Sequence, residues 1–246
     1  MIMEHSQKKI LGVIGGLGPV ATANFMELAA TMTDATTDQG HMEMIVYNTP
    51  SIPDRTDYIL DNSNPSPLEP MTDIGLKLVS LGAGCIAIPC MTAHYFYDRL
   101  AQRIPVPIIH ALEETVLHLQ KNGIHLVGIM ATDGTIASRI FHRVLEKYGM
   151  LPVTPDDQGQ KDMMQLIYGN IKAGLPPEMD RFYRVRDALV QDGAEATILG
   201  CTELALIKRD HPIGPGFINT LEVLAQQAVL RCGYKLKDEY SCLITK

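Results

Sequence analysis

The sequence of 246 residues contains no tryptophan, and aromatic residues make up only 6% of it. This scarcity argues against an aromatic-rich β-sandwich, whereas abundant small and aliphatic residues favour layered α/β structure. The length is sufficient to bury a substantial core, in one large domain or two small ones.

Positive charge is also scarce, since 21 Lys and Arg residues face 28 Asp and Glu residues and give a net charge of −7. Nucleic-acid binding depends on concentrated positive charge against phosphate, and no Lys/Arg cluster supplies it. We therefore expect no nucleic-acid partner, and an anionic ligand would require a few local cations.

Cysteines number five, and none stands in a CxxC or Cys/His spacing that would hold zinc. An odd number without a metal pattern indicates reduced thiols in a cytoplasmic protein. No long uninterrupted hydrophobic run is present either. Residues 10–26, behind Lys8 and Lys9, imitate a signal peptide, but glycines and a proline at 15–19 interrupt them. The segment is better interpreted as strand, turn and helix, and it is too broken to span a membrane.

One stretch occurs twice, at residues 82–94 (GAGCIAIPCMTAH) and 193–204 (GAEATILGCTEL). Each copy is a short apolar run behind Gly-Ala, which is typical of a buried parallel strand, and each ends in a cysteine, Cys90 or Cys201. Equivalent cysteines in two similar halves predict a pair of thiols that face one another across a cleft.

The remaining pattern predicts alternating strands and helices in both halves of the chain. The strands are expected at 10–14, 42–47, 105–109, 124–130 and 217–219, besides the two that lead to the cysteines. The helices are expected at 20–33, 70–81, 93–103, 111–121, 136–148, 163–172, 179–191 and 220–231. A proline-rich loop covers residues 48–55.

This order predicts two similar doubly wound α/β domains with parallel sheets, related by a pseudo-two-fold axis, with the active site in the cleft between them. The first domain would comprise residues 1–115 and 217–246 and carry Cys90. The second would comprise residues 116–216 and carry Cys201.

The turn at residues 16–21 matches the letters of the dinucleotide fingerprint GxGxxG/A. The match is weak, because no acidic residue ends the second strand and Pro19 removes a backbone N–H. The turn can still present amides to a small carboxylate.

Cys85, Cys232 and Cys242 are interpreted as ordinary small hydrophobic residues. Cys90 and Cys201 differ, because each terminates a strand and is followed closely by a threonine, Thr92 or Thr202. A thiol near a helix N-terminus has a pKa below its usual value of about 8.5 and becomes a usable base or nucleophile.

Several motifs occur in order along nearly the whole chain: residues 15–19 (GGLGP), 53–55 (PDR), 89–94 (PCMTAH), 131–135 (ATDGT), 171–174 (IKAG) and 200–204 (GCTEL). Together they resemble the aspartate/glutamate racemase family. The resemblance implies a two-domain α/β fold, no cofactor, usually a homodimer, and racemisation of a small anionic amino acid.

The resemblance also implies roles for particular residues. Cys90 and Cys201 would be the two acid/base thiols, because inversion at Cα needs proton removal from one face and delivery to the other. Substrate binding would involve a cation from each half together with nearby amides and hydroxyls: Arg55, Met91, Thr92, Ala93, Thr132, Lys172 and Thr202. His94 and Glu203 stand beside the cysteines but are not assigned a catalytic role.

Two positions depart from the family pattern: Met91 replaces an asparagine, and Asn219 replaces an acidic residue. A thioether cannot donate the hydrogen bonds of an amide, so Met91 leaves the choice between aspartate, glutamate and another acid open. The alternatives are a single-cysteine isomerase or decarboxylase of a dicarboxylic acid, and a non-catalytic small-carboxylate binding protein. A cofactor-dependent oxidoreductase is a more distant third.

Overall fold

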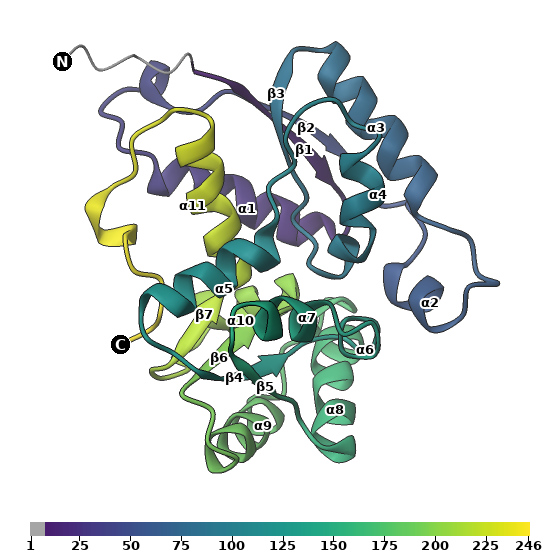
Figure 1. Cartoon of the computed structure of the whole chain (residues 1–246), viewed down its shortest axis with the longest axis vertical. Helices are drawn as coiled ribbons and strands as arrows, with labels where there is room; N and C mark the ends of the chain where they lie inside the picture. Colours follow the sequence, from purple (N-terminus) through teal and green to yellow (C-terminus); the bar gives the residue numbers. More distant parts are fainter. Residues whose placement is uncertain (1–7) are drawn as a thin grey trace.

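The computed structural model describes residues 8–246 as two parallel β-sheets with helices packed on their faces, one sheet above the other in Figure 1. The predicted α/β class with parallel sheets is therefore confirmed. The first seven residues of the predicted first domain lie outside the described residues.

The first sheet has the order β2-β1-β3, and its strands are β1 (Ile10–Gly15), β2 (Met44–Asn48) and β3 (Ala83–Ala87). The central strand β1 is buried from Leu11 onward, which explains its uninterrupted apolar sequence. The strand expected at 105–109 reduces to one parallel bridge between Ile108 and Ile86. Prolines at 105 and 107 lack the N–H groups that a longer ladder requires. The helices of this half are α1 (Pro19–Met32), α2 (Arg55–Leu60), α3 (Leu68–Ser80) and α4 (Tyr97–Ala101).

The second sheet has the order β5-β4-β6-β7, and its strands are β4 (Leu126–Met130), β5 (Leu151–Val153), β6 (Ala196–Leu199) and β7 (Phe217–Asn219). Its helices are α5 (Ala111–Lys121), which leads into it, α6 (Asp133–Ala137), α7 (Ile140–Lys147), α8 (Asp157–Met164), α9 (Met179–Gln191) and α10 (Thr202–Asp210).

The last helix, α11 (Thr220–Arg231), leaves the second sheet and packs against both α1 and α5 (Figure 1). It begins immediately after β7, a strand of the second sheet, and also contacts β3 of the first. Cys232 follows α11 and packs in the same buried apolar cluster as Cys85 of β3. The chain therefore returns to the first sheet through α11, while the exact domain division stays a prediction.

Three predicted helices differ in detail from the structure. The helix expected at 93–103 is a 3₁₀ turn, Thr92–Phe96, followed by α4. The helix expected at 136–148 is divided into α6 and α7, because Arg139 between them adopts a left-handed conformation with φ of 55°. The helix expected at 163–172 is a π-helix, Gln165–Ile171, that continues α8.

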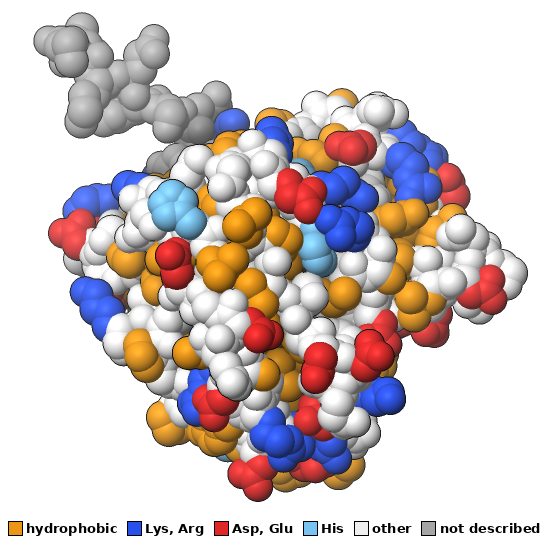
Figure 2. Space-filling model, turned by 60° about the horizontal axis from the view of Figure 1, so that its bottom comes forward, with side chains coloured by type: hydrophobic (Ala, Val, Ile, Leu, Met, Phe, Trp, Pro, Cys, Tyr) orange, Lys and Arg blue, Asp and Glu red, His pale blue; other side chains and the backbone are white. Residues whose placement is uncertain are grey.

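The face in Figure 2 carries acidic and basic side chains interspersed with one another and with apolar side chains. This mixture agrees with the sparse positive charge of the sequence. Among residues 8–246, no helix is both long and apolar enough to cross a membrane.

Candidate active site

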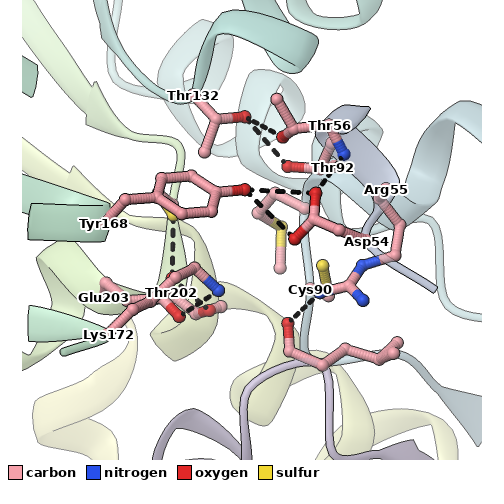
Figure 3. Close-up of a pocket in the computed structure, with 13 residues that line it drawn as sticks. Asp54, Arg55, Thr56, Cys90, Thr92, Thr132, Tyr168, Lys172, Thr202 and Glu203 are labelled. Carbon is pink, nitrogen blue, oxygen red and sulfur yellow. Dashed lines mark hydrogen bonds and ion pairs between the residues drawn. The ribbon is translucent and has the colours of Figure 1, made fainter. Parts of the chain in front are cut away.

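Loops at the carboxyl ends of the strands converge on one cavity between the two sheets (Figure 3). The carboxyl ends of parallel strands are the usual position of sites in α/β proteins. The side chains and backbone that line it come from both halves of the chain: Leu17, Asp54, Arg55, Thr56, Cys90, Met91, Thr92, Thr132, Tyr168, Lys172, Cys201, Thr202 and Glu203.

Both repeated cysteines line this cavity, Cys90 after the first sheet and Cys201 after the second. They are buried, with 6% and 5% of their surfaces exposed. The free space of the cavity is about 10 Å³, roughly enough for one water molecule. The two thiols therefore border the same small cavity.

On the second-sheet side, Cys201 is the N-cap residue of α10 and its thiol donates a hydrogen bond to Glu203 Oε2 at 2.9 Å. The other carboxylate oxygen, Oε1, lies 2.9 Å from Lys172 Nζ. Burial raises the pKa of Cys201 well above its ordinary value, and the negative charge of Glu203 raises it further. Lys172 opposes this effect without overcoming it.

On the first-sheet side, the guanidinium of Arg55 lies against Cys90. It donates to the carbonyl oxygens of Leu17 at 2.9 Å, Pro53 at 3.1 Å and Ile52 at 3.3 Å. Burial lowers the pKa of Arg55, but its electrostatic interactions with Cys90 and Asp54 more than compensate, so the pKa is raised overall. Arg55 Nε is buried and has no partner among the described residues, which leaves one donor for a ligand.

The sequence predicts that Arg55 is the last residue of the proline-rich loop. In the structure it is the first residue of α2. Asp54 is the N-cap, and its carboxylate accepts hydrogen bonds from the backbone N–H groups of Thr56 and Asp57. The hydroxyl of Tyr168 donates to the same carboxylate at 3.2 Å. An aspartate cap therefore fixes the start of α2 and joins it to the second half of the molecule.

The π-helix supplies Tyr168 to the cavity, and Lys172 is the residue that caps its C-terminal end. The Lys172 ammonium lies 5.2 Å from the centre of the Tyr168 ring, and burial raises the pKa of the Tyr168 phenol. The backbone at Lys172 is exposed, but only 24% of its side chain is, so the ammonium points inward to Glu203. Such π-helical turns frequently occur at functional sites.

Threonine hydroxyls close the end of the cavity opposite Lys172 and Glu203 (Figure 3). Thr92 Oγ1 lies 3.2 Å from Thr132 Oγ1 and 3.0 Å from Thr135 Oγ1, and Thr56 donates to Thr132 at 3.3 Å. Two of these residues come from each half of the chain, so the hydroxyl cluster also connects the two sheets.

The structure brings all of the predicted site residues to the cavity except Ala93. That residue is fully buried and its N–H donates to the Cys90 carbonyl at 3.2 Å. Met91, 1% exposed, borders the cavity and also packs in the main apolar cluster. Asn219 lies away from the cavity and caps α11 by accepting from Leu221 N–H.

The His94 ring is hydrogen-bonded to the backbone of the turn at Cys90. Its Nδ1 lies 3.1 Å from the Cys90 carbonyl, and its Nε2 accepts from the backbone N–H of Ala111 at 3.2 Å, which assigns the proton to Nδ1. Burial lowers the pKa of His94 to about 4. A neutral histidine bonded to backbone on both sides has a packing role.

Asp54, Thr56 and Tyr168 line the cavity but were not among the residues predicted from the sequence. Asp54 carried a usable signal, since aspartate immediately before a helix is a preferred N-cap. Tyr168 precedes Lys172 by four residues, yet only the fold brings it to Asp54, 114 positions earlier in the chain.

Comparison with known proteins agrees with this geometry. The chain is 31% identical to the solved structure of Picrophilus torridus aspartate racemase, with a TM-score of 0.82, and the match covers 94% of this chain and 97% of that one. It is 27% identical to the broad specificity amino-acid racemase RacX of Bacillus subtilis over 82% of this chain and 88% of the relative. The glutamate racemase of Francisella tularensis, solved with D-glutamate, shares the fold at 14% identity and a TM-score of 0.66, over 91% of this chain and 80% of that one.

A family model described as Asp/Glu/Hydantoin racemase matches residues 14–228, which include both cysteines and every other residue that lines the cavity. The protein therefore belongs to the Asp/Glu/hydantoin racemase family.

Proposed function

We propose that this protein is a cofactor-independent racemase of an acidic amino acid, aspartate or glutamate, that uses Cys90 and Cys201 in a two-base mechanism. The observation that carries the proposal is that one thiol from each sheet borders the same small, buried cavity. Membership of a racemase family and the likeness to an aspartate racemase support it.

The chemistry requires one group on each face of Cα. A thiolate takes the α-proton from one face while the opposite thiol donates its proton to the other face, and the thiolate then resides on the second sulfur. The enantiomeric substrate uses the groups in reverse, which restores the first state. Because the cavity is small and both thiols are buried, charge on the substrate carbanion would be stabilised by fixed donors with limited competition from water.

The two cations occupy positions suited to the two carboxylates of an acidic substrate. Arg55 offers its unpaired Nε to one carboxylate, and Lys172, held by a single ion pair to Glu203, can share its remaining N–H donors with the other. Asp54 supplies a carboxylate near Arg55 for the substrate ammonium. The hydroxyls of Thr92 and Thr132 offer further hydrogen bonds.

The proposal extends to the setting of the enzyme, a homodimer in the cytoplasm, as the family resemblance implies. All five cysteines are free, which suits a reducing compartment.

The test is racemisation of L-aspartate and L-glutamate, followed by chiral chromatography, with and without a carbonyl reagent that inactivates pyridoxal phosphate. We expect both enantiomers to approach equal amounts, unaffected by the reagent. Formation of a covalent adduct on one cysteine without inversion would instead indicate a single-cysteine isomerase or decarboxylase. Saturable binding of aspartate without exchange at Cα would indicate a binding protein.

A further inference from the structure

Next to the catalytic cavity lies a second, much larger space, a groove of about 440 Å³. The two share Leu17, Asp54, Arg55, Lys172 and Glu203 in their walls. The free space between the cysteines is about 10 Å³, whereas the groove is large enough to hold a long side chain. A substrate with its Cα between the thiols would therefore direct a long side chain toward the groove.

Beyond the shared wall the groove is mainly apolar. It is lined by the glycine-rich turn before α1 and by side chains from both halves of the chain: Pro19, Pro50, Ile52, Ile171 and Leu206. Ile52 and Leu206 are buried, with 5% and 9% of their surfaces exposed, so the groove is formed by packed residues of the fold. Convergent apolar walls with a few polar groups at one end are characteristic of small-molecule sites.

The charges at the inner end of the groove are already balanced. Lys172 is paired with Glu203 at 2.9 Å, and Arg55 faces Asp54 and three carbonyl oxygens. An uncharged side chain can pass between them without leaving a buried charge unpaired, whereas a carboxylate has to share Lys172 with Glu203.

We propose that this groove is a side-chain pocket for neutral amino acids with long apolar side chains, such as methionine and leucine, and that the enzyme racemises them in addition to acidic amino acids. The inference rests on the proposed two-thiol racemisation. An acidic side chain ends at Lys172, while a longer apolar one continues past it to Leu206 and Ile171. The α-carboxylate and the reacting Cα keep the same positions in both cases.

The experiment measures exchange of the α-proton in deuterated water for L-methionine, L-leucine, L-alanine and L-aspartate. We expect kcat/KM for methionine to exceed that for alanine, whose side chain does not reach the groove, by at least tenfold. Exchange of aspartate without exchange of methionine or leucine would overturn the groove proposal and leave the proposed function standing. Absence of exchange with any of the four would overturn both.

A variant that fills the groove tests whether the activity on methionine depends on this groove. Leu206→Trp should lower the methionine-to-aspartate ratio of kcat/KM at least tenfold, while Leu230→Trp, on the exposed side of α11, should leave the ratio unchanged. Should Leu206→Trp fail to fold, Ile171→Asp serves instead, since Ile171 is only partly buried and an apolar side chain in the groove would have to desolvate the new carboxylate. An altered oligomeric mass with an unchanged ratio would overturn the proposal and identify the groove as a contact between copies of the chain.

Discussion

Cys90 and Cys201 follow equivalent strands in two sheets, β3 and β6, yet the groups that touch them differ in charge. Cys90 meets the guanidinium of Arg55, whereas the thiol of Cys201 donates to the carboxylate of Glu203. Lys172 forms an ion pair with the other oxygen of that carboxylate. In the proposed mechanism the repeat supplies one proton-transfer group to each face of the substrate, and the surroundings make the two faces unequal.

This inequality has a definite kinetic meaning. Enantiomers have equal free energies, so kcat/KM must be equal in the two directions whatever the surroundings of each thiol. The difference between the halves must therefore appear in kcat and KM separately, and in the reactivity of each thiol in the free enzyme.

The largest expected effect comes from removing either thiol. Cys90→Ser and Cys201→Ser should each lower racemisation of aspartate by roughly 100-fold or more, because a serine hydroxyl is a far weaker acid and general acid–base groups contribute about 10² to 10⁴. Cys242→Ser, at an exposed cysteine outside the cavity, is the matched control and should retain full activity. Wild-type rates in either cavity variant would rule out the two-thiol mechanism.

A second prediction concerns His94, which supports only the Cys90 half. Its pKa is lowered to about 4 in the folded protein, so between pH 6.5 and 4 the unfolded chain binds a proton that the folded protein excludes. Stability contributed by the neutral ring is therefore complete above pH 6.5 and is lost as the pH falls. The expected loss at this one site is about 2 kcal/mol between pH 7 and 5.

Urea unfolding at both pH values measures it. His94→Gln should be less stable than the wild type at pH 7 but should show a smaller difference between pH 7 and 5. An unchanged pH dependence in the variant would mean that His94 is not the group that titrates.

A third prediction concerns the threonine end of the cavity, where α2 of the first half packs against α6 of the second. A Cβ at Gly134 would lie 2.8 Å from the Cα of Thr56, and backbone cannot move aside easily. Gly134→Ala should therefore destabilise the protein by about 1 to 2 kcal/mol and weaken contact between the halves. Ser138→Ala, at the end of α6, is a nearby control that should cost less, because it removes only a local hydrogen bond to the helix backbone.

The smallest expected effect comes from changing Glu203, the carboxylate beside Cys201. Because Glu203 raises the pKa of Cys201, Glu203→Gln should lower that pKa and allow the thiolate to form at lower pH. The rate of Cys201 alkylation as a function of pH, followed by peptide mass spectrometry, measures this shift.

Glu222→Gln provides the control, since Glu222 pairs with Lys208 outside the cavity. A Cys201 alkylation profile that does not move in Glu203→Gln would show that the carboxylate does not control this thiol.

Much of the fold could be predicted because its signals are local. Local sequence patterns predict the bounds of several elements almost as observed: the apolar runs of β1 and β6, and the helical patterns of α5, α9 and α11. Short-range exceptions were not predictable. Arg139 carries no glycine-like signal for its left-handed conformation, and the π-helix covers only seven residues, too few for its sequence pattern to be told from that of an α-helix.

The candidate site divides in the same way. The cysteines, Arg55 and Lys172 stand in short recognisable motifs, but the contact of Tyr168 with Asp54 depends on the packing of segments 114 residues apart. The partner of Lys172 likewise follows from the meeting of the π-helix with α10, which no local pattern specifies.

The two-thiol mechanism is tested most directly by the isotope in the first turnovers of L-aspartate in deuterated water. Two opposed thiols predict that newly formed D-aspartate carries deuterium at Cα, because its proton comes from the opposite, solvent-exchanged sulfur, while recovered L-aspartate keeps its original hydrogen. D-aspartate that retains the hydrogen of the substrate would contradict the mechanism, since it would show that a single group removes and returns the same proton.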